Sequence, residues 1–299
     1  MSPVPEILQS PALSCDLPAN RADSISASIV LYNTPESQME RLFRCLRGSS
    51  VHVATYLVDN SPQPLAYDCI RSSGFAYIRP QINGGYGAGH NIALRKILES
   101  SEYHFVLNPD IYFDNLALEE MLRFMDQDVT IGQLMPKIIY PDGSLQYLCK
   151  LLPTPFDLFL RRFAVGPLRK VLARRLSEFE LRHTPYDSVM DVPYLSGCFM
   201  LFRTSALRHI GIFDERFFMY PEDIDMTRRM HALFRTVYYP GATVVHDHAR
   251  QSYKTLRALW VHMYNLAKYF NKWGWLWDPE RARINRETLE RLPEVQVRR

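Results

Sequence analysis

The chain has 299 residues, of which 47% are hydrophobic and 22% charged, and it contains 13 glycines and 20 prolines. This composition is that of a globular protein with a sizeable core, and it excludes a disordered or collagen-like chain. The formal charge of +3 is too small to indicate a nucleic-acid-binding protein.

Cysteine spacing and the N-terminal sequence bear on the cellular compartment. The five cysteines lie at least 24 residues apart, so there is no Cys-x-x-Cys metal pair and no compact disulfide framework. Residues 1–20 lack a basic cluster followed by an apolar stretch, and no window approaches the roughly 18 apolar residues of a membrane span. We therefore expect a cytoplasmic protein that is neither exported nor membrane-spanning.

The predicted elements alternate between strands and helices after a flexible N-terminal arm at residues 1–24. Strands are predicted at 28–32, 52–58, 75–78 and 103–107, and helices at 36–47 and 91–100. This alternation is typical of a mostly parallel sheet covered by helices on both faces. In such a sheet, ligands bind at the carboxyl ends of the strands.

Polar residues follow three of these predicted strands. Tyr32 and Asn33 end the first strand, Asp59 the second, and Asn108 and Asp110 follow the strand at 103–107. We expect the three strand ends to line one crevice. The alternative is that these residues only form turns.

A glycine-rich stretch separates the third strand from the next predicted helix. It runs from Asn83 to Asn91 and contains Gly84, Gly85 and Gly87. Glycines in this context let the backbone approach a phosphate or sugar closely. The stretch lacks the Gly-Lys-Ser/Thr of a P-loop and the third glycine of a dinucleotide fingerprint. The alternative is a flexible turn.

The pattern changes after Asp110. A helix is predicted at 115–126, a strand at 131–140 and a tight turn at 141–144. Residues 150–182 then carry eight basic and three acidic side chains, a net charge of +5, and 168–181 is a basic amphipathic stretch. This surface is suited to an anionic bilayer interface.

Three acidic residues occupy the predicted first turn of a downstream helix. Glu222, Asp223 and Asp225 follow Pro221 and an aromatic run. Partial desolvation raises the pKa of a carboxylate toward working pH, which suits a general base. Acidic residues are also common at helix starts for electrostatic reasons alone.

Two histidines end a predicted strand at 243–248. His246 and His248 would project from one face of that strand. An imidazole there could complete an oxygen-rich site for a divalent metal with Asp110. A structural role for either histidine is the alternative.

Taken in this order, these motifs resemble those of the family 2 glycosyltransferases of the inverting GT-A type, particularly the bacterial O-antigen and rhamnan rhamnosyltransferases. The resemblance covers roughly residues 25–275. It implies an α/β GT-A fold, with a mostly parallel Rossmann-like central sheet flanked by helices and a C-terminal helical extension.

The resemblance also implies roles for individual residues. The nucleotide-sugar side would comprise Tyr32, Asn33, Asp59, Asn83, Gly84, Gly85, Gly87, Asn91, Asn108 and Asp110. Within this set, Asp59 would recognise the base edge of a uracil or thymine. Asp110 would bind a divalent metal, Mg or Mn, with His246 or His248 as the second ligand. Because Asn108 replaces the first acid of the family's Asp-x-Asp motif, weaker metal binding is implied.

On the acceptor side, the resemblance implies that Asp223 deprotonates the attacking hydroxyl beside Glu222. Gly197, Glu222 and Asp225 would bind the acceptor. The implied reaction transfers L-rhamnose from dTDP-rhamnose, with inversion, to a polyprenyl-linked O-antigen or surface polysaccharide. The alternatives are a UDP-hexose donor or a catalytically silent carbohydrate or membrane adaptor. A nucleotide-sugar pyrophosphorylase is disfavoured because residues 29–40 carry no basic glycine loop.

We predict three parts in the chain. Residues 1–24 form the arm, 25–255 a GT-A catalytic domain divided at residue 115, and 256–299 an amphipathic helical extension. Aromatic residues interleaved with lysines at 260–277 are typical of a helix at headgroup level. We therefore expect peripheral association with the inner face of the plasma membrane. The alternatives are packing on the domain or a contact in a homo-oligomer.

Overall fold

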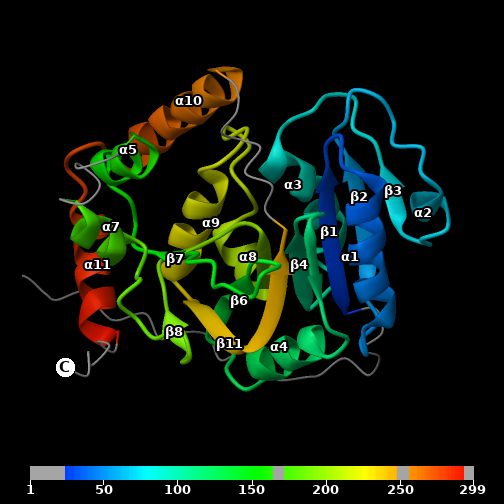
Figure 1. The fold of residues 1–299 in the computed structure, drawn as a ribbon, viewed down its shortest axis with the longest axis horizontal. Coiled ribbons are helices and arrows are strands. Elements are labelled where there is room, and N and C mark those ends of the chain that lie inside the picture. Colours follow the sequence, from blue (N-terminus) through cyan, green and yellow to red (C-terminus); the bar gives the residue numbers. More distant parts are fainter. Residues whose placement is uncertain (1–23, 164–171, 248–255, 293–299) are drawn as a thin grey trace, which may run out of the picture.

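Buried apolar runs alternating with amphipathic helices build a mixed α/β fold. The computed structural model describes residues 24–163, 172–247 and 256–292 (Figure 1). The strands of the central sheet are β1 (Ile25–Leu31), β2 (Ala54–Asp59), β3 (Ala76–Ile78), β4 (Tyr103–Leu107), β5 (Ile111–Phe113), β6 (Ile131–Ile139), β8 (Met190–Asp191), β10 (Phe199–Arg203) and β11 (Arg235–His246). A separate two-stranded sheet is formed by β7 (Cys149–Lys150) and β9 (Tyr194–Leu195).

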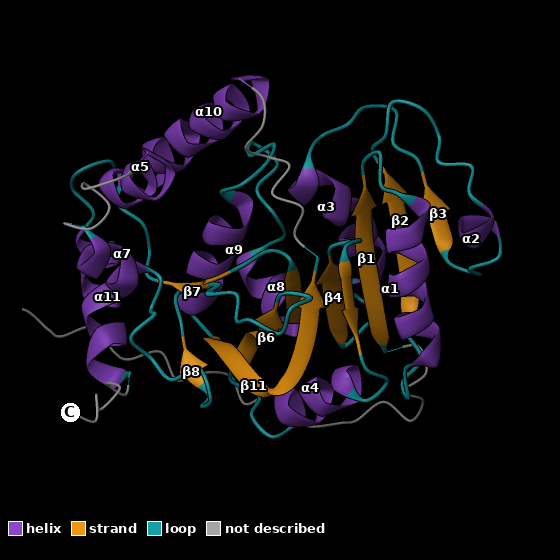
Figure 2. Ribbon diagram, in the orientation of Figure 1, coloured by secondary structure: helices purple, strands orange, loops and turns teal. Residues whose placement is uncertain are grey.

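Helices flank this sheet and form the C-terminal part of the described chain (Figure 2). They are α1 (Glu36–Gly48), α2 (Asp68–Arg71), α3 (Tyr86–Ile97), α4 (Ala117–Asp126), α5 (Pro155–Phe163), α7 (Ala173–Phe179), α8 (Thr204–Ile210), α9 (Glu222–His231), α10 (Leu256–Trp273) and α11 (Pro279–Arg291). In Figure 1, α10 lies above α9 and beside α5.

The strand order is β3-β2-β1-β4-β10-β6-β11-β5, and β8 pairs with β11. Strands β3, β2, β1 and β4 are mutually parallel, as are β6 and β11. Strand β10 runs antiparallel to both β4 and β6, and β5 and β8 run antiparallel to β11. The predicted mostly parallel α/β sheet with flanking and C-terminal helices is therefore confirmed, and the carboxyl ends of β1, β2 and β4 meet at one edge.

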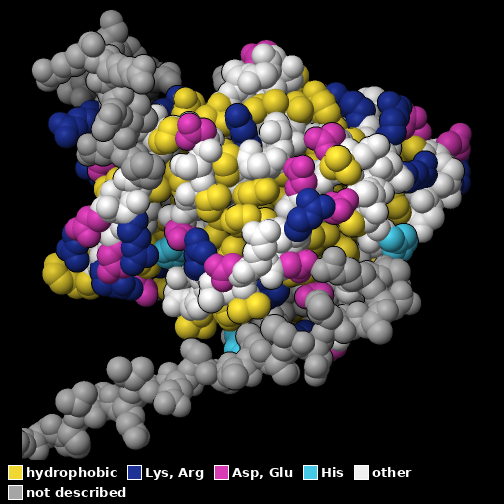
Figure 3. Space-filling view, turned by 90° about the horizontal axis from the view of Figure 1, so that it is seen from below, with side chains coloured by type: hydrophobic (Ala, Val, Ile, Leu, Met, Phe, Trp, Pro, Cys, Tyr) yellow, Lys and Arg dark blue, Asp and Glu magenta, His cyan; other side chains and the backbone are white. Residues whose placement is uncertain are grey.

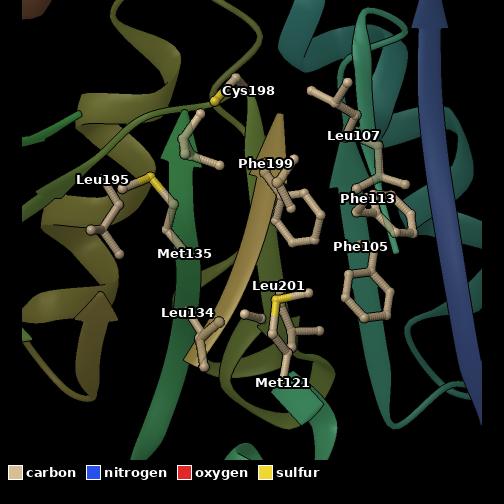
Figure 4. Close-up of a cluster of buried hydrophobic side chains, with 14 of the residues drawn as sticks. Phe105, Leu107, Phe113, Met121, Leu134, Met135, Leu195, Cys198, Phe199 and Leu201 are labelled. Carbon is tan, nitrogen blue, oxygen red and sulfur yellow. The ribbon is translucent and has the colours of Figure 1, made fainter. Parts of the chain in front are cut away.

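Aromatic packing joins the parallel and antiparallel parts of the sheet. The Phe199 ring on β10 lies 5.8 Å from that of Phe105 on β4 and 6.3 Å from that of Phe113 on β5. Figure 4 shows these rings together, with Met121 from α4 below them. Because all three rings are buried, this cluster fixes the middle of the sheet and hence the strand ends above it.

The predicted element boundaries were partly wrong. The strand at 103–107 coincides with β4, but α3 begins at Tyr86 rather than residue 91, and β11 begins at Arg235 rather than residue 243. Helix α3 starts early because its glycines allow close packing: a Cβ on Gly89 would lie 2.7 Å from a methyl of Val30 on β1. Strand β11 continues through a register shift between Tyr239 and Thr243.

Some predictions fall outside the described residues, namely residues 1–23 of the N-terminal arm, residues 164–171 of the basic stretch 150–182, and His248. Within the described residues, Cys45, Cys69, Cys149 and Cys198 are free thiols. No helix of this part of the chain combines the length and apolarity needed to cross a bilayer. Figure 3 shows the face at the amino-terminal edge of the parallel strands, where charges of both signs are interspersed with hydrophobic side chains.

Candidate active site

Asp59 ends β2 as a buried, multiply hydrogen-bonded carboxylate. It accepts hydrogen bonds from the Ser61 and Leu65 amides (2.9 and 3.0 Å) and the Tyr77 hydroxyl (2.5 Å), and the Arg79 guanidinium lies 3.5 Å away. Burial alone would raise the pKa of Asp59, but the hydrogen bonds lower it below its ordinary value. Asp59 is therefore held as an anion.

Tyr32 and Asn33 follow β1 at the same edge. The Tyr32 side chain is 56% exposed. Asn33 adopts a left-handed conformation (φ 49°), which asparagine tolerates better than most residues. Its backbone N–H donates to the Ser61 hydroxyl at 2.9 Å. Because Ser61 also contacts Asp59, the ends of β1 and β2 form one polar surface.

The glycine-rich stretch is held against the segment that precedes α9. The side-chain oxygen of Asn83 accepts the Gly85 amide at 2.9 Å, and the Tyr86 amide donates to the Phe218 carbonyl at 2.9 Å. Gly85 has φ 97°, and a Cβ there would lie 1.9 Å from the Phe218 oxygen. Only glycine fits this contact. Gly84 is exposed beside it.

Gly87 and Asn91 lie inside α3 rather than in a loop. A Cβ on Gly87 would approach Phe213 to 3.0 Å and Glu222 to 3.6 Å. Asn91 is fully buried, and its amide donates to the Phe213 carbonyl (2.9 Å) and to Glu215 (2.8 Å) while its oxygen accepts the Phe213 amide (3.0 Å). Asn91 therefore fastens the segment at 213–215, in contrast to its predicted contact with the donor.

A second polar group lies at the ends of β4 and β11. The His246 Nε2 atom is 3.3 Å from an oxygen of Asp110, and that oxygen has no hydrogen-bond partner. The backbone N–H of Asn108 donates to the Cys198 carbonyl at 3.0 Å, and this hydrogen bond joins the end of β4 to the start of β10. Burial lowers the pKa of His246, but Cys198 and Asp110 outweigh it and raise this pKa to about 10.

Gln146, which the sequence analysis missed, orients this imidazole. Its side-chain nitrogen donates to the carbonyls of His246 (2.8 Å) and Ile139 (3.3 Å). The Gln146 oxygen must therefore face the His246 Nδ1 atom, 3.0 Å away, and accept its proton. The Nε2 atom is thereby directed at Asp110. No sequence signal pairs two residues 100 positions apart.

The predicted catalytic acids lie at the start of α9. Asp223 is partly exposed and accepts hydrogen bonds from the backbone N–H groups of Gly197 (3.0 Å) and Ile224 (2.8 Å). Glu222 is buried, and burial followed by the neighbouring Asp223 raises its pKa to about 8. The two adjacent carboxyl groups therefore differ in environment: Asp223 can meet a substrate, whereas Glu222 faces the interior.

Tyr86 lies near both acidic groups. Its hydroxyl donates to the Gly197 carbonyl at 2.6 Å. Burial raises the pKa of Tyr86 well above its usual value, and four neighbouring groups raise it further: Glu222, Cys198, Asp223 and Asp110. The Gly197 N–H donates to Asp223 at 3.0 Å, and the neighbouring Cys198 carbonyl accepts the Asn108 N–H at 3.0 Å, so the Gly197–Cys198 segment links the start of α9 to the end of β4.

Asp225 was predicted to bind the acceptor, but its oxygens are engaged within the protein. Its carboxylate is fully buried and contacts Arg229 (2.8 Å), Lys272 (2.6 Å) and the indole nitrogen of Trp273 (2.7 Å). Asp225 therefore ties α9 to α10.

The described residues hold no group of three or more His, Cys, Asp and Glu side chains arranged for a metal. Asp110 and His246 supply two donors, and His248 lies outside the described residues.

The family model for "Glycosyltransferase like family 2" matches residues 42–264. An N-acetylglucosaminyl-diphospho-decaprenol L-rhamnosyltransferase of Mycobacterium tuberculosis is 29% identical over 184 residues, covering 57% of this chain and 58% of that protein. The rhamnosyltransferase WbbL of Escherichia coli is 26% identical over 253 residues, covering 81% and 90%. This chain thus matches little more than half the length of the mycobacterial relative.

Solved structures share the fold at low identity. GalNAc-T7 with UDP, GalNAc and Mn²⁺ aligns with a TM-score of 0.57 at 14% identity, covering 75% of this chain and 43% of that one. The Pyrobaculum calidifontis mannosyltransferase PcManGT with GDP-Man and Mn²⁺ aligns at 0.53 and 14%, covering 84% and 64%. At such identities the likeness is one of fold.

Proposed function

The chain belongs to the glycosyltransferase-like family 2, and we propose that it transfers a sugar from a nucleoside diphosphate to a glycan hydroxyl with inversion. The observation that supports this proposal is that the Gly197–Cys198 segment, which Tyr86 contacts, links Asp223 at the start of α9 to the end of β4, the strand that precedes Asp110. Inverting transfer needs stabilisation of the leaving diphosphate on one side of the sugar and a base on the other. We propose that Asp110 and Asp223, which come from different elements joined through this segment, meet that need.

On the donor side, we propose that Asp59, Tyr32 and Asn33 bind the nucleoside. An ionised Asp59 would accept the ring N–H of a uracil or thymine at Oδ1, which accepts the Ser61 N–H and keeps a second lone pair, whereas Oδ2 is occupied by the Leu65 N–H and the Tyr77 hydroxyl. The exposed Gly84 and neighbouring Asn83 would contact the sugar diphosphate. Our first candidate donor is dTDP-rhamnose, because two similar proteins are named rhamnosyltransferases. A UDP-hexose is the second.

We propose that Asp110 and His246 hold a divalent cation, Mg²⁺ or Mn²⁺. The residues fit this role, since a buried Asp110 oxygen lacks a hydrogen-bond partner and Gln146 leaves Nε2 directed at it, and a bound cation would displace the His246 proton. Such a cation supplies positive charge to the leaving diphosphate. Asn108 contributes no charge there, so with only one carboxylate among these donors we expect modest affinity.

Asp223 is the proposed base. Its exposure allows an acceptor hydroxyl to reach it, and the backbone N–H groups of Gly197 and Ile224 hold its carboxylate in place. Glu222 shapes the interior side of the same turn. We further propose that the acceptor is lipid-linked, that residues 25–255 form the catalytic unit, and that the protein binds the cytoplasmic membrane face through α10.

The test is a panel of nucleotide sugars assayed for nucleoside diphosphate release, with and without Mn²⁺ or Mg²⁺, in the presence of a polyprenyl diphosphate glycan. Asp223→Asn should lower turnover by about 10²- to 10⁴-fold, because the attacking hydroxyl loses its base. The donor KM should change little, since Asp223 lies on the acceptor side.

Asp142→Asn serves as a matched control in an exposed turn and should retain full turnover. If Asp223→Asn were as active as the wild-type protein, Asp223 could not be the base. If no donor in the panel were consumed, the non-catalytic adaptor would be favoured.

A further inference from the structure

A half-open cavity of about 620 Å³ lies between α5 and α10. This volume is within the range of small-molecule sites, which is about 300–1,000 Å³. Apolar side chains dominate its wall: Phe156, Leu158, Phe159, Leu259, Met263, Leu266, Ala267, Phe270, Trp275 and Leu276. Several of them remain exposed, among them Phe159 at 53% and Leu276 at 92%.

The charges in this wall have one sign. Its described lining residues include Arg175 and Arg281 but no carboxylate. The Arg175 guanidinium lies 4.8 Å from the centre of the Phe156 ring, pairs with Asp157 at 2.7 Å, and belongs to a side chain that is 48% exposed. Arg281 is buried, 3.8 Å from Asp278. The wall is therefore complementary chiefly to an apolar chain, and Arg175 is its exposed cation.

The cavity also adjoins the segment that carries the catalytic acids. His262 lines the cavity and stacks on Tyr220 with ring centroids 4.3 Å apart. Tyr220 has φ 92°, a conformation that side-chain-bearing residues rarely adopt, and lies two residues before Glu222. Next to His262 on α10, Asn265 accepts the Phe218 amide at 2.9 Å. A molecule in the cavity would thus lie beside the acceptor side of the proposed active site.

We infer that the cavity between α5 and α10 binds the isoprenoid chain of a polyprenyl-diphosphate-linked acceptor. The inference rests on the proposed function, because that function supplies an acceptor at Asp223. The similar mycobacterial protein is named for a decaprenol-linked substrate, which has this chemistry. The apolar wall takes the chain, and the exposed part of Arg175 faces the anionic head group.

The experiment measures binding of farnesyl diphosphate to the full-length protein by titration calorimetry, with no sugar transfer involved. Ala267→Trp fills the cavity from α10 and should weaken binding by at least about tenfold. Met263→Glu places a carboxylate on a wall that has none and should weaken it similarly. Met263 is 45% exposed, so this variant is expected to fold.

Trp260→Ala is the matched control, because Trp260 lies on the same helix but does not line the cavity. It should bind farnesyl diphosphate as the wild type does. All variants should bind dTDP or UDP unchanged, which verifies folding. Farnesol should compete with farnesyl diphosphate, and inorganic diphosphate should compete poorly.

Unchanged farnesyl diphosphate binding in both cavity variants would overturn the inference. Complete displacement by inorganic diphosphate would also overturn it, because the ligand would then occupy the nucleotide site. So would a wild-type protein that binds phosphatidylglycerol vesicles but not farnesyl diphosphate, since the surface would then be a membrane contact. If farnesyl diphosphate binds as expected but no donor is consumed, the proposed function fails and the cavity assignment stands.

Discussion

At the scale of single residues, the site depends on side chains whose partners lie far away in sequence. Asp59 and Asp110 could be identified because each directly follows an apolar strand. Tyr77 and Arg79 beside Asp59, and Gln146 beside His246, could not, since only the folded sheet brings them together. The same holds for Asp225, whose partners Lys272 and Trp273 are on α10.

Gln146 provides a test of the metal site at this scale. Gln146→Leu removes the acceptor that fixes the His246 ring, so Mn²⁺ affinity should fall by about 10- to 100-fold. The measurement is electron paramagnetic resonance of Mn²⁺ titrated with protein and a nucleoside diphosphate. Gln127→Leu, at an exposed position after α4, should bind normally. Equal affinity in both variants would argue against Asp110 and His246 as ligands.

Glu222 predicts a pH dependence of stability. Its pKa rises from an ordinary value of 4.5 to about 8 on folding, so the folded state binds the extra proton between these values. Stability should therefore fall as pH rises through that window. Glu222→Gln removes the ionisable group, so the variant should be stabilised relative to wild type by about 1 kcal/mol or more near pH 8 and much less near pH 5.

Thermal unfolding of both proteins across this pH range measures the effect of Glu222. A difference in Tm that stays constant from acid to alkaline pH would show that Glu222 does not change its protonation there.

At the scale of elements, long buried runs were easier to predict than interrupted ones. Strand β4 matched because all five of its residues are buried and the run ends at Asn108. Strand β11 was predicted too short because Pro240 and Gly241 interrupt its pattern, while pairing with β6 continues beyond them. The start of helix α3 was predicted too far along the chain, because glycines lower helix propensity and the sequence there resembles a loop.

The contact between α9 and α11 yields a prediction about stability. Asp278 accepts hydrogen bonds from both terminal nitrogens of Arg228, at 2.7 and 2.9 Å, and both side chains are almost fully buried. Asp278→Asn removes the buried counter-charge of the guanidinium and leaves only the half-exposed Glu280 at 3.2 Å, so it should cost about 3–5 kcal/mol. Arg283→Ala breaks an exposed pair with Glu287 on the same helix and should cost about 0.5 kcal/mol or less.

Urea unfolding of the Asp278 and Arg283 variants provides the comparison. If the two losses were equal, the buried pair would not be what holds α11 to α9.

At the scale of the whole molecule, the fold class followed from the alternating pattern, whereas the arrangement of the C-terminal helices did not. Helix α10 carries an outer stripe of Trp260 (76% exposed), Tyr264 (63% exposed) and Lys268, spaced four residues apart. Residues so spaced share one side of a helix. This stripe is distinct from the cavity-facing side of the same helix.

We therefore predict that the protein floats with phosphatidylglycerol vesicles in a density gradient and that raised salt weakens binding, because salt screens attraction to anionic lipids. Replacing Trp260 and Tyr264 with Ala should reduce flotation. Leu233→Ala, an exposed apolar position outside α10, should not. A protein that stays at the bottom of the gradient but forms a dimer through these aromatics would show a homo-oligomer contact instead.

The backbone of Phe218 touches both halves of the proposed site. Its carbonyl accepts the Tyr86 amide beside the glycine stretch, and its N–H donates to Asn265 on α10. Occupancy of the nucleotide side and of the lipid side would therefore bias the same short segment. Where binding of one substrate moves this segment, it should alter the affinity for the other, and by thermodynamic reciprocity the factor is the same in both directions, so the backbone of one residue would couple the two proposed substrate sites.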